Sequence, residues 1–289
     1  MAIYYWQNFS RNLNSRNFGD DINPRLLSGL FRKEIVKSPD VCIVGIGTLL
    51  DSQKLDTIQH YKNKIVFSSG AGYGDLREPL DQSWHISCVR GPLTAAYLSR
   101  PAKLGVCDGA ILLPEVAGIA PSASRQGATF IPHINTAYEF DGILKEACAI
   151  AGIRYLRPDA EFDHFMMAAA SSDLVLSEAM HGAIVADAFR TPWICTPFKL
   201  HNEFKWRDWC QSLDLPYRPH RFGQAALPKR GERLARGYRK IAFSPIVHSL
   251  ARQLAQISRF DPCLSDGRLL AEKREILQDK VAEINRVYA

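Results

Sequence analysis

Five short polar segments carry side chains that could bind an anion or transfer protons. They are NFGDD (17–21), GIGT (45–48), VRGPLT (89–94), the segment around Asp108, and SEAMHG (177–182). Ligands of open α/β sheets bind beyond the carboxyl ends of the strands, so polar residues that follow a strand or begin a helix are the first candidates for a site. Arginine, histidine and carboxylate side chains there suit phosphate or carboxylate binding and general acid–base chemistry.

The segment that begins at Ser177 is the most informative of the five. The strand pattern DLVLS ends at Ser177, and the helix that we expect to start at Glu178 carries His181 in its first turn. The free N–H groups and positive dipole end of such a helix form an anion site, to which His181 adds a donor. His133 also follows a strand pattern and could face the same ligand. The alternative for His181 is a histidine whose ring is satisfied inside the core.

Three basic residues are candidates for binding an anionic ligand. Arg90 ends a strand pattern, where its guanidinium can form a bidentate bond with a carboxylate or phosphate. Lys205 and Arg207 lie in HNEFKWRDW, after a later strand pattern. Phosphate chemistry uses such cations, although basic residues on an exposed helix often have no role in a site.

Two acids are candidates for proton transfer. Asp108 is flanked by small residues after an apolar run, so it is either a buried structural acceptor or an acid or base with a raised pKa. Asp20 follows Asn17 in a loop that leads into an amphipathic helix, and the alternative for this segment is a simple N-cap.

The sequence contains no motif that indicates a metal or a cofactor. GIGT lacks the third glycine and the following acid of a dinucleotide-binding fingerprint. The chain also has no HExxH, P-loop, GxSxG elbow or convincing His/Cys metal cluster.

The elements that must position these residues alternate between β-rich and amphipathic runs. This pattern predicts parallel strands joined by helices, and hence an α/β fold of two Rossmann-like domains that face each other across a cleft. A polar stretch of small residues, APSASRQGA, separates two series of such runs, so we place the domains at 1–124 and 125–289. Two C-terminal helices are expected, one beginning at Ser244 with Pro245 and the other at Ser265. Other helices are expected from Asp20, from Pro92, near 140–151 and near 161–170.

Composition narrows the class of protein. With 289 residues, 46% hydrophobic and 23% charged, the chain is typical of a globular enzyme and unlike disordered, fibrous or membrane-spanning proteins. Its seven cysteines are widely spaced and include no CxxC pair, which favours a reducing compartment. The N-terminus lacks a signal-peptide pattern, and no long apolar run occurs, so we expect a cytoplasmic protein.

Positive charge is concentrated in one block near the C-terminus. From Lys229 to Arg259 there are eight lysines or arginines and one acid, Glu232. Such a block suits an anionic membrane surface or a pyrophosphate-bearing lipid, and would place the protein on the inner face of the cell membrane. The alternative is a solvated helix face. We do not expect nucleic-acid binding, because no aromatic-rich recognition motif accompanies the charge.

The chain resembles the polysaccharide pyruvyltransferase family over roughly residues 17–215. The resemblance rests on the order and spacing of NFGDD, GIGTLL, SSGAGYGD, VRGPLT, Asp108, Pro132-His133 and SEAMHGAIVADAFRTPWI. It implies a GT-B-like architecture, phosphoenolpyruvate as the donor substrate, and a sugar of a surface polysaccharide as the acceptor, often in a lipid-linked precursor. The first domain would then serve the acceptor and the second the donor phosphate.

The resemblance also implies roles for individual residues. Arg90, His181 and Lys205 match the donor-binding positions of the family. We accordingly expect Asp108 or Asp20 to transfer protons on the acceptor and His181 or His133 to act near the donor. The substrate-binding residues predicted in total are Asn17, Arg90, His133, Ser177, Glu178, Lys205 and Arg207. The chain departs from the family where Ile46 interrupts consecutive glycines and where Asp108-Gly109 replaces an Asp-Pro pair.

Two other functions remain open from the sequence. A GT-B glycosyltransferase that uses a nucleotide sugar would share the fold and the anion site at a helix start. Retaining members often have two glutamates eight positions apart, whereas the acid nearest to the expected position after Glu178 is Asp187, one residue late. The third interpretation is a nonenzymatic subunit of a polysaccharide assembly complex.

Overall fold

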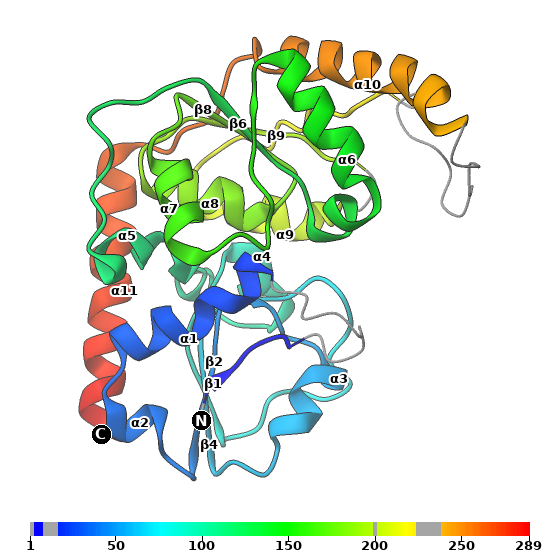
Figure 1. The fold of residues 1–289 in the computed structure, drawn as a ribbon. Coiled ribbons are helices and arrows are strands. Elements are labelled where there is room, and N and C mark those ends of the chain that lie inside the picture. The colour runs from blue at the N-terminus through cyan, green and yellow to red at the C-terminus, as the bar shows by residue number, and fades with distance from the viewer. Residues whose placement is uncertain (1–2, 8–16, 199–200, 224–237) are drawn as a thin grey trace. The chain divides into compact units, whose positions relative to one another are not determined.

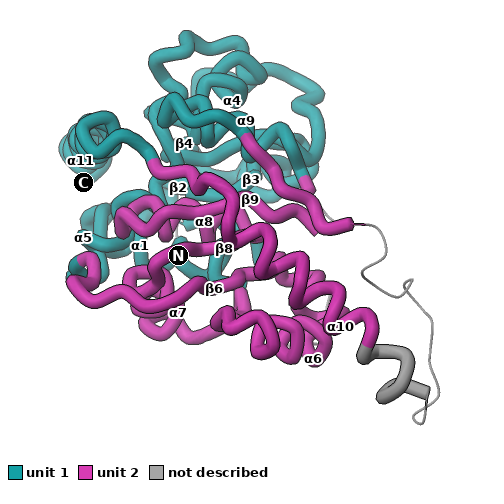
Figure 2. The backbone as a smooth tube through the Cα atoms, turned by 90° about the horizontal axis from the view of Figure 1, so that it is seen from above, with its two compact units in different colours: residues 1–120, 202–217, 265–289 teal, residues 121–201, 218–264 magenta. Residues whose placement is uncertain are grey.

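The protein, described by a computed structural model, forms two compact units, drawn in teal and magenta in Figure 2. Unit 1 comprises Met1–Ala120, Asn202–Tyr217 and Ser265–Ala289, and unit 2 comprises Pro121–His201 and Arg218–Leu264. The structure describes residues 3–7, 17–198, 201–223 and 238–289, with side chains in the last range from Pro245 onward.

This division corrects the predicted domains. The predicted boundary after residue 124 lies close to the observed one after Ala120, but the predicted second domain, 125–289, is not a single unit. The chain returns to unit 1 twice, at 202–217 and at 265–289 (Figure 2). Local sequence patterns do not reveal this return, because side chains far away in the sequence fix both segments to unit 1.

Unit 1 is built on five parallel strands (Figure 1). These are β1 (Ile3–Tyr4), β2 (Val41–Val44), β3 (Gly47–Thr48), β4 (Asn63–Gly70) and β5 (Trp84–Val89). Four of them pair in the order β1-β2-β4-β3, and β5 also pairs with β4. All four residues of β2 are buried, as expected for a strand of a parallel sheet that is covered on both faces.

Unit 1 also contains α-helices from each of its three chain segments. They are α1 (Phe18–Leu30), α2 (Lys33–Val36), α3 (Ser52–Leu55), α4 (Pro92–Tyr97), α5 (Leu113–Ala117), α9 (Glu203–Ser212) and α11 (Gly267–Tyr288). Helix α1 buries Ile22, Leu26 and Leu27, which lie on one face at helical spacing. Helix α4 confirms the start predicted at Pro92, a residue that favours the first helical position.

Unit 2 is built on a second, four-stranded parallel sheet with the order β7-β6-β8-β9. The strands are β6 (Ala128–Ile131), β7 (Arg154–Tyr155), β8 (Leu174–Ser177) and β9 (Trp193–Cys195), and the helices are α6 (Ile134–Ala151), α7 (Phe162–Ala170), α8 (Met180–Ala188) and α10 (Tyr238–Ile257). Two helix starts differ from prediction. Helix α6 begins directly after His133 and has non-helical backbone angles at Phe140, where the predicted helix began. Helix α8 begins two residues after Glu178.

The two C-terminal helices confirm that part of the predicted fold, with one correction. The first was expected to begin at Ser244 with Pro245, but α10 begins at Tyr238 and contains Pro245. Val247 and Leu250 of this helix pack in the core of unit 2, and such packing outweighs the one backbone hydrogen bond that proline removes. Helix α11 begins at Gly267, two residues after the predicted Ser265, and the Asp266 carboxylate caps it by accepting hydrogen bonds from the N–H groups of Arg268 and Leu269.

Both units therefore have the α/β architecture with parallel sheets that the sequence predicts. All seven cysteines are buried, and burial raises the pKa of Cys42 and Cys148 to about 12, so both thiols are inert at neutral pH. Among the residues that the structure describes, no helix combines the length and the apolar character needed to cross a membrane.

Candidate functional site

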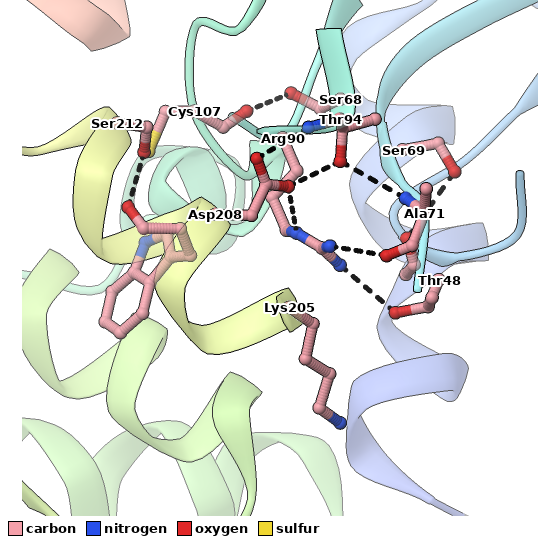
Figure 3. Close-up of polar contacts among 12 residues, drawn as sticks. Thr48, Ser68, Ser69, Ala71, Arg90, Thr94, Cys107, Lys205, Asp208 and Ser212 are labelled. Atoms are coloured by element: carbon pink, nitrogen blue, oxygen red, sulfur yellow. Dashed lines mark hydrogen bonds and ion pairs between the residues drawn. The ribbon is translucent and has the colours of Figure 1, made fainter. Parts of the chain in front are cut away.

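In unit 1, the carboxyl edge of the sheet holds a buried network around Arg90. The guanidinium donates from Nε to Asp208 Oδ2 (2.9 Å), from Nη1 to Thr48 Oγ1 (3.1 Å) and from Nη2 to the Ala71 carbonyl (2.8 Å). Asp208 also accepts hydrogen bonds from the Thr94 backbone N–H (2.9 Å) and hydroxyl. Figure 3 shows these contacts converging between α9 and the ends of β4 and β5. Arg90 follows β5 and Asp208 lies on α9, so this ion pair, in which both side chains are 0% exposed, anchors α9 to the sheet.

Two glycines make room for this network. A Cβ atom at Gly70 would lie 2.2 Å from Cζ of Arg90, and one at Gly91 would lie 2.1 Å from the backbone oxygen of Asp208. Any side chain at either position would push the ion pair apart. The GP dipeptide in VRGPLT therefore serves close packing of α9 as well as the start of α4. Arg90, predicted as a donor ligand, thus has protein acceptors around its guanidinium, and its contact with a ligand stays a prediction.

A second buried contact links the predicted segments NFGDD and GIGT. The Asn23 side chain is 0% exposed, accepts a hydrogen bond from the Ile46 N–H (2.8 Å) and donates to the Ile46 carbonyl (3.2 Å). A Cβ atom at Gly45 would lie 2.1 Å from Oδ1 of Asn23, so this glycine is needed for the approach. Asn23 therefore fixes the start of α1, and with it Asp20, against the loop that follows β2.

Asp20 has the electrostatic environment of a neutral-pH acid or base. Burial raises its pKa to about 6; the hydrogen bond from Asn17 Nδ2 (2.6 Å) opposes the rise, the Asp21 charge adds to it, and the Lys205 charge opposes it. The side chain remains partly exposed. The structure thus joins two predicted site residues, Asn17 and Asp20, by a hydrogen bond. The charge of a third, Lys205, acts on the Asp20 carboxylate.

Asp108 is a buried helix cap with a similarly raised pKa. Its Oδ1 accepts a hydrogen bond from the Ala110 N–H (3.0 Å) at the start of a 3-10 turn, and the residue is 0% exposed. Burial raises its pKa to about 6, while the Ala110 hydrogen bond and the Arg90 charge oppose the rise and the Asp208 charge adds to it. The structure therefore shows the structural role that the sequence left open for Asp108, a buried hydrogen-bond acceptor. The raised pKa expected of an acid or base is present as well.

The two predicted cations of α9 differ in their surroundings. Figure 3 shows Asp208 pointing into the Arg90 network while Lys205 extends away from it. The Lys205 ammonium lies 3.3 Å from the Tyr73 hydroxyl. Arg207 pairs with Glu203 one turn earlier (2.6 Å), with both side chains about half exposed, and its guanidinium covers the ring of Tyr217.

In unit 2, Glu178 connects three segments at the carboxyl edge of the sheet. Its carboxylate is 2% exposed and accepts hydrogen bonds from the His133 N–H (2.8 Å), the Thr136 hydroxyl (3.0 Å) and the Phe198 N–H (3.3 Å). Glu178 thus holds the start of α6 and the chain after β9 beside the end of β8. This is a positioning role, and substrate binding by Glu178 stays a prediction.

Both predicted histidines stand at helix starts in unit 2. His133 caps α6, and its Nδ1 accepts a hydrogen bond from the Asn135 N–H (3.3 Å), so Nε2 carries the proton of the neutral ring. His181 is the second residue of α8 and is partly exposed. The N-cap residue of α8 is Ala179, which provides no side-chain cap, and Ser177 donates its hydroxyl to the Ala179 carbonyl (2.6 Å).

Three further predictions from the sequence concern Asp187, the basic block and a metal site. Asp187, the acid considered for a glycosyltransferase, is buried and accepts a hydrogen bond from the Trp193 indole (2.9 Å), which is a structural contact. Six of the eight basic side chains in the block from Lys229 to Arg259 lie outside the part of the chain whose side chains are described. The other two, Arg252 and Arg259, are exposed side chains of unit 2. Within the described ranges, no group of three or more histidine, cysteine or carboxylate side chains is arranged to hold a metal ion.

Sequence reasoning missed Asp208 and Asn23. Asp208 lies between Trp206 and Trp209, all three are buried, and an acid inside such an apolar context indicates a buried partner. Asn23 gave a weaker signal, an amide among the apolar residues of an amphipathic helix.

Comparisons with known proteins agree with the resemblance in sequence. A family model described as polysaccharide pyruvyl transferase matches residues 3–197. The chain is 37% identical over 245 residues to the succinoglycan biosynthesis protein ExoV of Rhizobium meliloti (strain 1021), which covers 83% of this chain and 72% of that protein. Among solved structures it is similar to E. coli ADP-heptose LPS heptosyltransferase II, at 13% identity and a TM-score of 0.28 over 83% of this chain and 97% of that one. A structural likeness at that score carries no argument about function.

Proposed function

Because the chain belongs to the polysaccharide pyruvyl transferase family, we propose that it transfers a pyruvyl unit from phosphoenolpyruvate to a sugar of a lipid-linked surface-polysaccharide precursor. The family match over residues 3–197 is the observation that carries this proposal, since it spans both parallel sheets. The product is a pyruvate ketal, and phosphate is released.

The reaction sets the chemical requirements of the site. Protonation of the methylene carbon of phosphoenolpyruvate makes C2 electrophilic, and one sugar hydroxyl attacks C2 and loses its proton. The bond from C2 to the phosphate oxygen then breaks, and the second hydroxyl attacks and loses its proton in turn. One hydroxyl proton balances the proton taken up by the methyl group, and the other balances the phosphate released. The enzyme must therefore bind two anionic groups and supply an acid and a base.

We assign the donor phosphate to the start of α8. The first turn of that helix directs N–H groups outward, Ala179 offers them no side-chain cap, and His181 stands among them. Helix starts of this kind favour anions through both hydrogen bonds and the dipole. His133 supports the assignment to unit 2, because it stands at the start of α6, directly after a strand of the same sheet.

Among the three cations that the sequence suggests, Lys205 is the one best suited to bind an anionic group of a ligand in unit 1. Arg90 is engaged by Asp208, Thr48 and Ala71, and Arg207 pairs with Glu203, whereas the ammonium of Lys205 meets only the neutral hydroxyl of Tyr73 among its hydrogen bonds in the described contacts. We assign proton transfer on the acceptor to Asp20, whose pKa of about 6 lets it exchange a proton near neutral pH.

The deciding experiment measures phosphate release from phosphoenolpyruvate with a panel of lipid-linked and synthetic β-galactosides, β-glucosides and mannosides. We expect phosphate release that depends on the acceptor, and a mass gain of one pyruvate ketal on the sugar by mass spectrometry. The rate of phosphate release should be unchanged when EDTA removes metal ions. Binding of a nucleotide sugar without any binding of phosphoenolpyruvate would overturn the proposal in favour of a glycosyltransferase. Donor binding that never leads to phosphate release with any acceptor would favour a nonenzymatic subunit.

A further inference from the structure

Two exposed aromatic rings in unit 1 flank a single lysine. Trp6 is 44% exposed and Tyr73 is 61% exposed, both unusual for such large rings. The Lys54 ammonium lies 5.5 Å from the centroid of the Trp6 ring and 5.7 Å from that of Tyr73. Exposed aromatic surface gathered in one place marks a ligand-binding surface more often than chance exposure.

The loop that carries Tyr73 is held on both sides, so the exposure of the ring is built into the fold. The Gly72 carbonyl accepts a hydrogen bond from the Asn202 side chain, and the Gly74 carbonyl accepts one from the Tyr97 hydroxyl (3.0 Å). Gly72 has a φ of +137°, which a residue with a side chain rarely adopts. The segment SSGAGYGD therefore uses its glycines to present a tyrosine outward from a fixed backbone.

Lys54 is fixed with equal care between the two rings. Its ammonium pairs with Asp51, which is 5% exposed and also caps α3 by accepting a hydrogen bond from the Lys54 N–H. The Tyr4 hydroxyl donates to the Lys54 carbonyl (2.8 Å), and Trp6 follows Tyr4 at the end of β1. The rings thus surround a preorganised ion pair rather than a flexible surface lysine.

This aromatic surface continues to the residues proposed for proton transfer. The Lys205 ammonium lies 5.7 Å from the centroid of the Tyr73 ring and within hydrogen-bond distance of its hydroxyl. The charge of Lys205 in turn acts on Asp20. A ligand lying on Tyr73 is therefore close to Lys205, whose charge acts on Asp20.

We infer that Trp6, Tyr73 and the Asp51–Lys54 pair form a subsite of unit 1 that binds a pyranose ring of the acceptor glycan. A pyranose has a face of C–H groups that packs on aromatic rings and a rim of hydroxyls that bond to an ammonium, and the Lys54 side chain keeps 14% of its surface exposed beside the two rings. The inference deepens the proposed function and rests on it for the identity of the ligand as an acceptor.

The test compares Trp6→Ala and Tyr73→Ala with Tyr73→Phe, which keeps the ring and loses the contact with Lys205. Phe260→Ala, which removes a ring 39% exposed in unit 2, is the matched control. Binding is read by saturation-transfer NMR with methyl β-galactoside, methyl β-glucoside and methyl α-mannoside, and acceptor KM is read from phosphate release. We expect transfer to the sugar C–H protons in the wild type, its loss in both alanine variants, and an acceptor KM raised about tenfold. Phe260→Ala should behave as the wild type, Tyr73→Phe should keep transfer to the sugar C–H protons because it keeps the ring, and Trp6→Ala should leave the KM for phosphoenolpyruvate unchanged.

The outcomes separate this inference from the proposed reaction. A wild-type protein that binds none of the glycosides, or alanine variants that bind them as well as the wild type, would overturn the subsite. Glycoside binding that depends on both rings, in a protein that never releases phosphate from phosphoenolpyruvate, would support the subsite and overturn the reaction. Turnover with an unchanged acceptor KM in both alanine variants would support the reaction and overturn the subsite.

Discussion

Helix α9 takes part in two arginine–carboxylate pairs that differ in burial. Arg90 and Asp208 are both 0% exposed, whereas Arg207 and Glu203 are 50% and 48% exposed. The first pair joins the helix to the sheet, and the second lies along the helix surface. Replacing one partner at a time should therefore have very different consequences for stability.

The structure sets the expected magnitudes. Asp208→Leu leaves the Arg90 guanidinium buried without its carboxylate and removes two acceptors from Thr94, so we expect a loss of about 3–5 kcal/mol in the free energy of unfolding. Arg90→Met should cost a similar amount, because it leaves a buried carboxylate. The double variant should cost at least about 2 kcal/mol less than the sum of the two, since it leaves no unpaired charge. The equivalent coupling for Glu203→Ala and Arg207→Ala should be about 0.3–0.5 kcal/mol.

Urea unfolding followed by tryptophan fluorescence measures both cycles, and the buried Trp206 and Trp209 report on α9 itself. A coupling energy for the buried pair that is as small as that of the surface pair would refute the view that Arg90 anchors this helix.

Three further predictions concern proton binding, the donor and the membrane. Burial raises the pKa of Asp108 in the folded protein to about 6 from its ordinary value of 3.8. Protonation of Asp108 therefore stabilises the fold below about pH 4, and this contribution is lost as the pH rises through 6. Asp108→Asn, which keeps the cap, should therefore gain stability relative to the wild type between pH 4 and pH 8 by up to about 3 kcal/mol, as urea unfolding would measure; a pH-independent difference would contradict the assigned pKa. His181→Ala should raise the KM for phosphoenolpyruvate about tenfold or more, whereas the exposed His164→Ala on α7 should not, and equal values in steady-state assays would remove the anion site from α8. The basic block from Lys229 to Arg259 should cause sedimentation with liposomes in proportion to their anionic lipid, and indifference to that content would leave a solvated helix face.

The sequence predicts the sheets well, because each parallel strand is a short apolar run closed by a turn signal. Val41–Val44 and Leu174–Ser177 lie where their patterns indicate, and α4 begins at its proline. Such signals are local, and burial on both faces makes them strong. Helix starts were less well predicted where packing decides, as with α10, which continues through Pro245.

What the sequence could not show is where distant segments meet. Asp208 bonds to Arg90 across 118 positions, and α11 rejoins unit 1 through contacts such as the hydrogen bond from Asn285 to the Leu30 carbonyl. No periodicity encodes these pairings, so the second domain was predicted as one piece. For the same reason Arg90 read as a ligand-binding residue, since a strand-end arginine looks alike whether its partner is a substrate or a buried aspartate.

Asp20 and Asp108 show why a perturbed pKa alone does not identify a catalytic base. Burial raises the pKa of both carboxyl groups to about 6, and both lie in unit 1. Asp108 is 0% exposed and holds the first N–H of a turn, so a substrate hydroxyl does not reach it in this conformation. Asp20 is partly exposed, is oriented by Asn17, and feels the charge of Lys205 beside the exposed ring of Tyr73. Proton transfer requires contact with the reacting group as well as a matched pKa, so access favours Asp20 for the acceptor while Asp108 supports the same edge of the sheet from within.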